Sequence, residues 1–225
     1  MLKEENTSFL KNAFRIWDKL SNEEQELLLH HTSVVHYQQG ECIHHGENDC
    51  VGVILVKSGC IRSYMLSDKG KEVTLYRLYS GDICILSASC LLQNITFDIH
   101  VDAQEDSEVL LIHSAAFSKL MASNVYVENF SYKMTMEKFS EVMWAMEQIL
   151  FMSFDKRLAI FLLDEATKSK SPTIKLTHEQ IAKYIGSARE VVSRMLKYFA
   201  SEGWVELSRG GMTLINVQKL KELIQ

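Results

Sequence analysis

The sequence LTHEQIAKYIGSAREVVSRMLKYFASEG, residues 176–203, determines how the rest of the chain is interpreted. Apolar residues recur at helical spacing on both sides of Gly186, a pattern that predicts two short helices joined by a tight turn. Thr177 and Gln180 have the spacing of a capping box, in which two side chains satisfy backbone N–H groups at a helix start. The first helix is therefore expected to begin just after Thr177.

Three more positions match a helix-turn-helix. Ala182 supplies the small residue of the first helix, Gly186 the turn residue that tolerates a positive φ, and Val192 the buried branched residue of the second helix. We interpret the stretch as a helix-turn-helix, with an ordinary corner between two helices of a helical domain as the alternative.

The second predicted helix carries polar side chains that point away from its apolar face. An arginine fork fits the O6 and N7 edge of guanine, and a carboxylate accepts from the amino group of cytosine. Side chains of these types on one helix face are typical of base readout, and a solvated face without partners is the alternative. The residues concerned are Arg189, Glu190, Ser193 and Arg194.

The length and composition indicate a globular protein of two domains. The chain has 225 residues, of which 47% are hydrophobic, and no apolar run approaches the roughly 18 residues of a membrane span. The start, MLKEENTS, lacks the apolar core of a signal peptide. We therefore expect a cytoplasmic protein. Five cysteines between Cys42 and Cys90, an odd number, favour reduced thiols over a disulfide framework.

The net charge of −5 is unevenly distributed. Residues 155–225 carry 12 Lys and Arg against 8 Asp and Glu, a net charge of +4, whereas residues 1–154 carry 12 against 21, a net charge of −9. The pI of about 5.9 argues against a nucleic-acid partner for the chain as a whole. The asymmetry places such a partner at the C-terminal part alone.

Residues 33–112 predict an antiparallel roll or barrel, because short β-rich runs alternate with glycine turns. Residues 7–30, which precede them, predict one or two short helices, with Ser21 and Glu24 as a second N-cap signature. The runs are VVHY, CVGVILV, CIRSYML, EVTLYRL, ITFDIHV and EVLLI, and the turns hold Gly40, Gly46, Gly59, Gly70 and Gly81.

A long helix is predicted between the roll and the helix-turn-helix, within residues 114–154. Its apolar residues follow a heptad spacing that suits the seam of a two-fold dimer, and a dimer would match palindromic DNA. A helix packed only on its own domain is the alternative. The heptad residues are Tyr132, Met136, Phe139, Met143, Met146 and Leu150.

The C-terminal part is expected to start at a hinge near Ser153, with Asp155 as the N-cap of a new helix. KSKSPT, residues 168–173, predicts a loop, and Gly210–Gly211 within WVELSRGGMTLIN predicts a β-hairpin of the form of a wing. The expected fold class is α+β. It comprises N-terminal helices and an antiparallel, jelly-roll-like β roll over residues 1–124, a dimerisation helix and hinge over 125–153, and a winged helix-turn-helix over 154–225.

In this order of parts the chain resembles the Crp/Fnr family of bacterial transcription regulators over nearly its whole length. YQQGECIHHGENDCVGVILVKSGCIRSYMLSDKGKEVTLYRLYSGDI is similar to the family's cyclic-nucleotide-binding-type roll, and SAREVVSRMLKYFASEGWVEL to its recognition helix and following strand. The resemblance implies base readout by Arg189, Glu190 and Arg194, with Ser193 carried over less directly because family members differ there. Candidate contacts to DNA phosphates are Thr177, Lys197 and Arg209.

The roll departs from the family's cyclic-AMP-binding pattern. Members that bind cyclic AMP carry a Gly-Glu pair for the ribose and an Arg-Ser or Arg-Thr pair for the phosphate. Alignment places Ile85-Leu86 and Phe97-Asp98 at these positions, and Asp98 would repel a phosphate. We therefore expect a more apolar pocket and an unidentified effector other than cyclic AMP, or a regulator that is constitutive.

Cys84 and Cys90 flank the same run and complete the set of candidate pocket residues. A thiol-redox or ligand role is one interpretation, and buried structural cysteine is the other. Residues 1–41 hold no cysteine, so no iron–sulfur cluster is expected. His44 and His45 point to opposite faces of a strand and cannot readily share a metal, so neither a metal site nor a haem is expected.

We expect a homodimeric, sequence-specific DNA-binding regulator and not an enzyme, because no nucleophile–base pair, carboxylate dyad or phosphate-cradling glycine loop stands out. The resemblance implies contact with RNA polymerase, for which the loop Ser67–Glu72 is a candidate, and no membrane partner is expected. Two alternatives remain. One is a small-ligand or thiol-redox sensing module that acts through protein partners, and the other is a cupin-like metal-binding enzyme.

Overall fold

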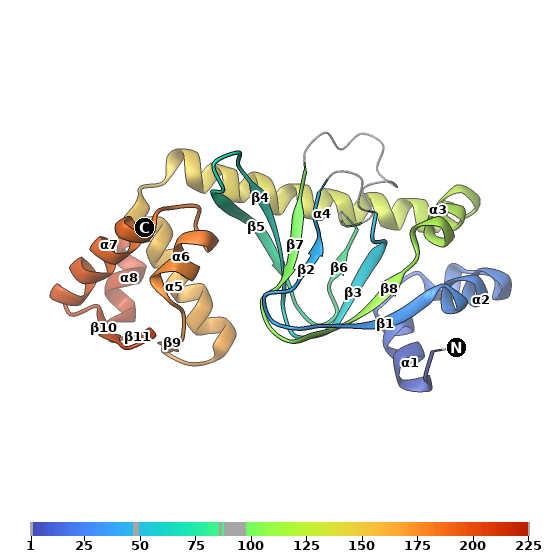
Figure 1. Ribbon diagram of the computed structural model, residues 1–225, viewed down its shortest axis with the longest axis horizontal. Helices are drawn as coiled ribbons and strands as arrows, with labels where there is room; N and C mark the ends of the chain where they lie inside the picture. The colour runs from blue at the N-terminus through green and yellow to red at the C-terminus, as the bar shows by residue number, and fades with distance from the viewer. Residues whose placement is uncertain (1, 47–49, 86, 88–97, 225) are drawn as a thin grey trace. The chain divides into compact units, whose positions relative to one another are not determined.

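The structure is a computed structural model that describes residues 2–46, 50–85, 87 and 98–224. The chain divides into two compact units, one of residues 1–66 and 75–142 and one of residues 67–74 and 143–225. Figure 1 shows their helices and strands along the chain. The predicted α+β fold class is confirmed.

Three short helical segments precede the first strand. Ser21 and Glu24 form the predicted capping box, in which the Glu24 N–H donates to the Ser21 hydroxyl over 3.2 Å. Leu10, Phe14 and Leu28 are fully buried and attach these segments to the core of the N-terminal unit. The segments are α1 (Glu4–Ala13), the 3-10 turn η1 (Trp17–Lys19) and α2 (Asn22–His30).

The predicted antiparallel roll consists of two four-stranded sheets, in the orders β1-β8-β3-β6 and β2-β7-β4-β5. They enclose a core that includes the fully buried Ile54, Leu55, Ile61 and Leu110. The short strands β2 and β6 were not predicted, because two or three residues carry little periodicity. The strands are β1 (Thr32–Tyr37), β2 (Cys42–His44), β3 (Val53–Ser58), β4 (Ile61–Leu66), β5 (Glu72–Leu78), β6 (Ile83–Cys84), β7 (His100–Ala103) and β8 (Ser107–Ile112).

Gly59 illustrates the role of glycine in this roll. It connects β3 to β4 with a φ of +83°. A Cβ atom at this position would lie 2.5 Å from the carbonyl oxygen of Asp106. Both the left-handed backbone and the close approach of the neighbouring chain therefore require glycine here.

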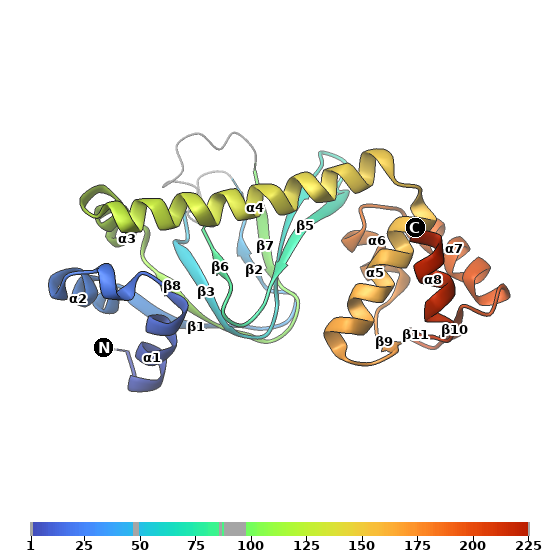
Figure 2. The ribbon, with the colours of Figure 1, turned by 180° about the vertical axis from the view of Figure 1, so that it is seen from behind.

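The predicted long helical segment is two helices, α3 (Ser114–Ser123) and α4 (Val125–Phe151). Asn124 separates them, because its extended backbone ends α3 and its Oδ1 accepts the Tyr126 N–H over 2.9 Å at the start of α4. Figures 1 and 2 show α4 running alongside the strands of the roll, and Val127 and Ser131 on α4 are fully buried.

Another face of α4 is apolar and exposed. The residues of the predicted heptad have exposed fractions between 46% and 66% in the chain as described. Large apolar side chains in a contiguous exposed row mark a binding surface on a soluble protein. We call this row the α4 stripe: Tyr132, Met136, Phe139, Met143, Met146 and Leu150.

The C-terminal unit contains the predicted helix-turn-helix and hairpin, with two elements that were not predicted. The hairpin β10–β11 is extended by β9 into a three-stranded sheet of order β10-β11-β9. Helix α8 packs against α5 through the fully buried Leu220 and the core around Leu158. The elements are α5 (Phe154–Ser169), β9 (Thr173–Ile174), α6 (His178–Tyr184), α7 (Arg189–Ser201), β10 (Val205–Ser208), β11 (Gly211–Leu214) and α8 (Val217–Ile224).

The start of α5 corrects one prediction. Its N-cap is Ser153, which has an extended backbone, and Asp155 lies inside the first helical turn. The predicted N-cap was wrong by two residues. An aspartate is favourable at the N-cap, and it is also favourable in the first helical turn, where its carboxylate complements the helix dipole, so its presence alone does not decide between the two positions.

The cysteines correct another expectation. Cys50 is disulfide-bonded, whereas Cys42, Cys60 and Cys84 form no disulfide. An odd number of cysteines still permits one pair, and the spatial separation of two cysteines decides whether they can pair.

In the described part of the chain, no helix is long and apolar enough to cross a membrane.

Candidate nucleic-acid interface

The helix-turn-helix is built by local interactions that the sequence predicted. The Gln180 N–H donates to Thr177 Oγ1 over 3.2 Å, and the Thr177 N–H donates to Gln180 Oε1 over 2.8 Å. Gly186 has a φ of +62° in the turn. Ala182 and Val192 are both buried where α6 and α7 meet. The capping box, the turn glycine and the two buried positions are confirmed.

Arg157 holds the turn in place, a role that the sequence did not reveal. Its Nη1 donates to the carbonyl oxygen of Ile185, at the end of α6, over 3.1 Å. Its guanidinium carbon also lies 5.6 Å from the centre of the Phe154 ring. This contact satisfies a carbonyl that has no partner within the helix and links α5 to the turn.

The outer face of α7 carries the predicted base-reading residues. A hollow of about 450 Å³ is lined by Arg189, Glu190, Ser193, Arg194 and Lys197. Ser193 is half-buried and the other four side chains are exposed. On the opposite side of the helix, Val192, Leu196 and Phe199 are fully buried in the core. The structure thus brings all four predicted base-reading residues to one surface, together with Lys197 from the predicted phosphate set.

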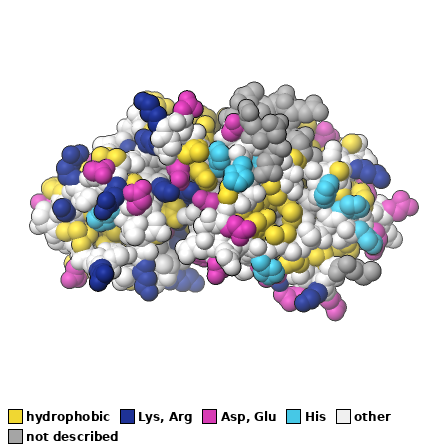
Figure 3. All heavy atoms as spheres, in the orientation of Figure 1, with side chains coloured by type: hydrophobic (Ala, Val, Ile, Leu, Met, Phe, Trp, Pro, Cys, Tyr) yellow, Lys and Arg dark blue, Asp and Glu magenta, His cyan; other side chains and the backbone are white. Residues whose placement is uncertain are grey.

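A second hollow, of about 550 Å³, lies where the starts of α6 and α7 meet the turn of the hairpin. Thr177 and Arg189 line it, so one predicted phosphate contact adjoins one predicted base contact. Arg209 is exposed in the hairpin turn and lines neither hollow. Figure 3 shows further Lys and Arg side chains on the surface of the C-terminal unit. The residues around the second hollow are Leu176, Thr177, His178, Glu179, Arg189, Ser208, Gly210 and Gly211.

His178 is a site residue that sequence reasoning missed. It is half-buried at the edge of the second hollow. Burial lowers the pKa of His178 below its usual value, and the positive charges of Arg189 and Lys197 lower it further. The sequence shows that His178 directly follows the N-cap residue Thr177 and that α7 carries Arg189 and Lys197. It does not show that these two charges lie close to His178.

The structure describes only part of the predicted effector pocket. Cys84 and Ile85 are buried in the roll, and Asp98 is exposed. Leu86, Cys90 and Phe97 lie outside the described residues. Near Cys84, burial raises the pKa of Tyr76 well above its usual value, with Cys84 as a smaller cause. Within the described ranges, no group of three or more His, Cys, Asp or Glu side chains could hold a metal ion.

Two family models match the chain. The model of the cyclic nucleotide-binding domain matches residues 34–124. The model of the Crp-like helix-turn-helix domain matches residues 156–223. The first match covers most of the roll and the second covers the surface just described.

Individual proteins are similar over most of their lengths. A solved structure of a transcriptional regulator of the Crp/Fnr family from Eubacterium rectale is 41% identical, with a TM-score of 0.92 over 95% of this chain and 99% of that chain. The cyclic AMP receptor protein of Thermus thermophilus is 26% identical over 91% of this chain and 94% of that protein. The fumarate and nitrate reduction regulatory protein of Vibrio cholerae is 24% identical over 83% of this chain and 76% of that protein.

Proposed function

Because the chain belongs to the Crp/Fnr family of transcription regulators, we propose that it works as a homodimer that binds palindromic DNA through the outer face of α7. The observation that carries this proposal is the hollow on α7, where two arginines and a glutamate lie exposed on a helix whose other side is fully buried. A rigid helix with such an outer face suits insertion into the major groove.

We assign base readout to Arg189, Glu190 and Arg194, with Ser193 in a supporting role. Arginine recognises guanine by a bidentate contact and glutamate accepts from cytosine, each for about 1–3 kcal/mol of discrimination. Thr177, Lys197 and Arg209 contact phosphates and fix the register of the protein on the duplex. The position of Lys197 at the edge of the hollow on α7 supports its part in this assignment.

The α4 stripe supports the dimer. Its heptad spacing is the spacing of a two-helix seam, and its six large side chains are exposed in the single chain. A two-fold axis along α4 would present two α7 helices to successive major-groove faces about 34 Å apart. The stripe therefore supplies the symmetry that a palindromic site requires.

The regulation that we propose follows from the residues of the roll. Ile85-Leu86 and Phe97-Asp98 replace the residues that hold ribose and phosphate in cyclic-AMP-binding members, so the protein either responds to a molecule other than cyclic AMP or is constitutive. The loop Ser67–Glu72 is the candidate contact with RNA polymerase. The protein acts in the cytoplasm, without an iron–sulfur cluster or haem.

Selection of bound sequences from random duplex DNA by the purified full-length protein tests the proposal. The expected product is a palindrome whose half-sites lie about one helical turn apart. Affinity for this duplex should fall steeply as the salt concentration rises, because bound phosphates release counterions. Failure to enrich any sequence, with and without cell extract as a source of effector, would contradict the proposal.

A further inference from the structure

The first residues of strand β5 belong to the C-terminal unit, although the strand continues into the roll. The boundary between the two units falls inside β5, directly after Thr74. Glu72, Val73 and Thr74 therefore group with the helix-turn-helix, whereas residues 75–78 group with the roll. We call the first three residues the β5 contact. One strand thus takes part in both units.

Thr74 completes the C-terminal end of α6. The last carbonyl groups of a helix have no partner within the helix and need donors from elsewhere. The Ala182 carbonyl accepts the Ser187 N–H over 2.9 Å, a bond made within the helix-turn-helix itself. The next carbonyl, that of Lys183, accepts from Thr74 Oγ1 over 3.2 Å. The end of α6 therefore uses a hydroxyl group from a strand that continues into the roll.

Glu72 and Val73 add an ion pair and an apolar contact at the same place. Lys183 Nζ donates to Glu72 Oε1 over 2.9 Å, and both side chains are partly exposed. Val73 lies beside Gly186 in the turn, where a Cβ atom would be 3.4 Å from Val73 Cγ2. The β5 contact therefore engages both the end of α6 and the turn that leads into α7.

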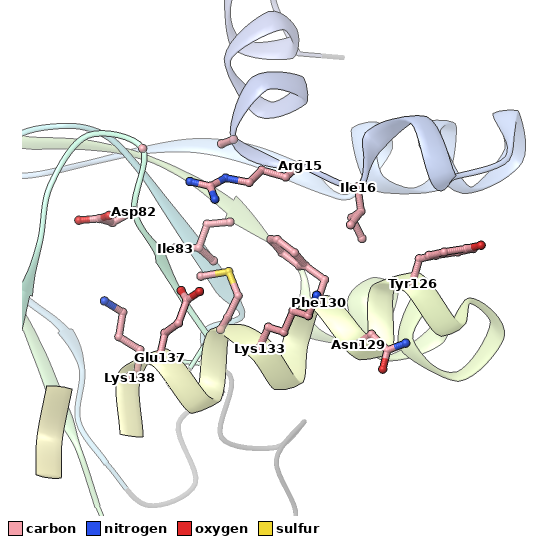
Figure 4. A pocket seen from close by; sticks show the side chains of 13 residues that line it. Arg15, Ile16, Asp82, Ile83, Tyr126, Asn129, Phe130, Lys133, Glu137 and Lys138 are labelled. Carbon is pink, nitrogen blue, oxygen red and sulfur yellow. The ribbon is translucent and has the colours of Figure 1, made fainter. Parts of the chain in front are cut away.

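The rest of β5 is fixed in the roll. Tyr76 and Leu78 are buried in its core. The Lys138 amine of α4 lies 5.0 Å from the centre of the Tyr76 ring, and Figure 4 shows Lys138 among the side chains that line a cavity of about 840 Å³. Strand residues advance by about 3.3 Å each, so Tyr76 and Thr74 lie about 7 Å apart along the strand. A displacement of the strand at Tyr76 therefore reaches Thr74.

The β5 contact does not cover the surface that we propose for DNA binding. That surface is formed by the start of α6 and the outer face of α7, and neither Lys183 nor Gly186 lines either of its two hollows. Arg189 and Arg194 are exposed while the contact is made. The contact can therefore support the helix-turn-helix without blocking it.

We propose that the β5 contact is the regulatory connection between the roll and the helix-turn-helix, and that the chain binds DNA when this contact is made. The DNA-binding part of this inference rests on the proposed function. A signal that displaces β5 in the roll withdraws Glu72 and Thr74 from Lys183, and the turn before α7 then opens. Regulation requires both arrangements to be populated, and a signal shifts the balance by its preference for one of them.

A charge-reversal cycle in the full-length protein tests the contact. Hydrogen exchange of residues 178–188, followed by mass spectrometry, reports opening of the turn. Glu72→Lys and Lys183→Glu should each accelerate this exchange about twofold or more, because like charges replace a partly exposed ion pair. The double variant should restore the slow exchange, since it restores the pair with its charges reversed. Unchanged exchange of residues 53–66 in the roll shows that the variants are folded.

Thr74→Val is a second variant that does not depend on charge. Valine keeps the shape of threonine but cannot donate to the Lys183 carbonyl, so exchange of residues 178–188 should again be faster by about twofold or more. This variant decides the matter if a charge reversal prevents folding.

Affinity for the selected duplex separates the contact from general electrostatic attraction. Glu72→Lys adds positive charge, which by itself attracts DNA, yet it should weaken binding about twofold because the turn opens. Glu202→Lys makes the same charge change at an exposed residue outside both hollows and should not weaken binding. The double variant Glu72→Lys, Lys183→Glu should bind like the unmodified chain.

Other results would overturn the inference. Unchanged exchange at the turn in both Glu72→Lys and Thr74→Val, or a double variant that exchanges as fast as the single variants, would show that the contact does not hold the turn. Faster exchange with unchanged DNA affinity would overturn the regulatory connection alone. If the unmodified chain binds no duplex, the proposed function fails, whereas the hydrogen-exchange cycle still decides whether the contact holds the turn.

Discussion

Arg194 and Lys197 lie within one helical turn on the outer face of α7 but are assigned different tasks. Both line the same hollow and both are exposed. A base contact discriminates between sequences, whereas a phosphate contact raises the affinity for all of them. Substitutions at the two positions therefore separate base readout from the sequence-independent attraction to DNA phosphates.

Arg194→Ala should weaken binding to the selected duplex by about 1–3 kcal/mol, the cost of one bidentate base contact. Binding to a scrambled duplex should change much less. Lys197→Ala should weaken binding to both duplexes alike and reduce the salt slope by about one phosphate contact. Fluorescence anisotropy at several salt concentrations measures these effects, and Lys221→Ala, at an exposed lysine of α8, is the control. Identical behaviour of the first two variants would refute the assignment.

DNA affinity should depend on pH through His178. In the free protein, burial and the charges of Arg189 and Lys197 hold the pKa of His178 below its usual value, while Glu179 is the acidic side chain beside it in the second hollow. A DNA phosphate nearby would raise this pKa, so the complex binds more protons than the free protein. The affinity should therefore increase as the pH falls from about 7.5 to about 5.5, by up to about tenfold for each unit of pKa difference.

His178→Gln isolates this effect from other titrating groups. The variant keeps a polar side chain at the edge of the hollow but cannot take up a proton near neutral pH. Its DNA affinity should vary less with pH than that of the unmodified chain, in titrations at constant ionic strength. An unchanged pH profile would show that His178 does not face a phosphate.

At the scale of elements, the turn between α6 and α7 depends on two different kinds of support. Gly186 supplies a left-handed backbone conformation, and Arg157 supplies a hydrogen bond to the carbonyl oxygen of Ile185. The first is a local property of one residue, and the second crosses from α5. Together they support the turn that joins α6 to α7.

Gly186→Ala should lower the free energy of unfolding of the C-terminal unit by about 1 kcal/mol, because a φ of +62° is strained for a residue with a Cβ. Ser187→Ala is the control, since Ser187 has an ordinary negative φ. Urea unfolding followed by the fluorescence of Trp204, in a chain with the other two tryptophans replaced by phenylalanine, reports on this unit. Equal stability of the two variants would contradict the role of the turn.

At the scale of the whole molecule, we expect the α4 stripe to decide the oligomeric state. Phe139→Glu introduces a charge into the middle of the proposed dimer seam, where a desolvated charge without a partner would cost several kcal/mol. We expect a monomer in light scattering and a large loss of affinity for the palindrome, with affinity for a single half-site retained. Gln148→Glu, elsewhere on α4, is the charge-matched control. A Phe139→Glu protein that remains dimeric would exclude the stripe as the seam.

Sequence patterns predicted the elements that rest on local interactions. The capping boxes at Ser21 and Thr177, the turn at Gly186 and the heptad of α4 each involve residues a few positions apart, so their physical cause is contained in the pattern. Prediction failed where an element is short or depends on distant partners. Strand β6 has two residues, β9 exists because it pairs with β11, and the disulfide of Cys50 depends on spatial separation.

The amino-acid sequence by itself determined the class of the protein, the order of its parts and which polar side chains share the outer face of α7, because the helical period decides which residues lie on one face. Only the tertiary structure decided which residues from different segments meet. It placed Arg157 on the turn, His178 beside Arg189, and Thr74 on the carbonyl oxygen of Lys183. Such contacts join positions from 11 to more than a hundred residues apart, and only the packing of the folded chain brings them together.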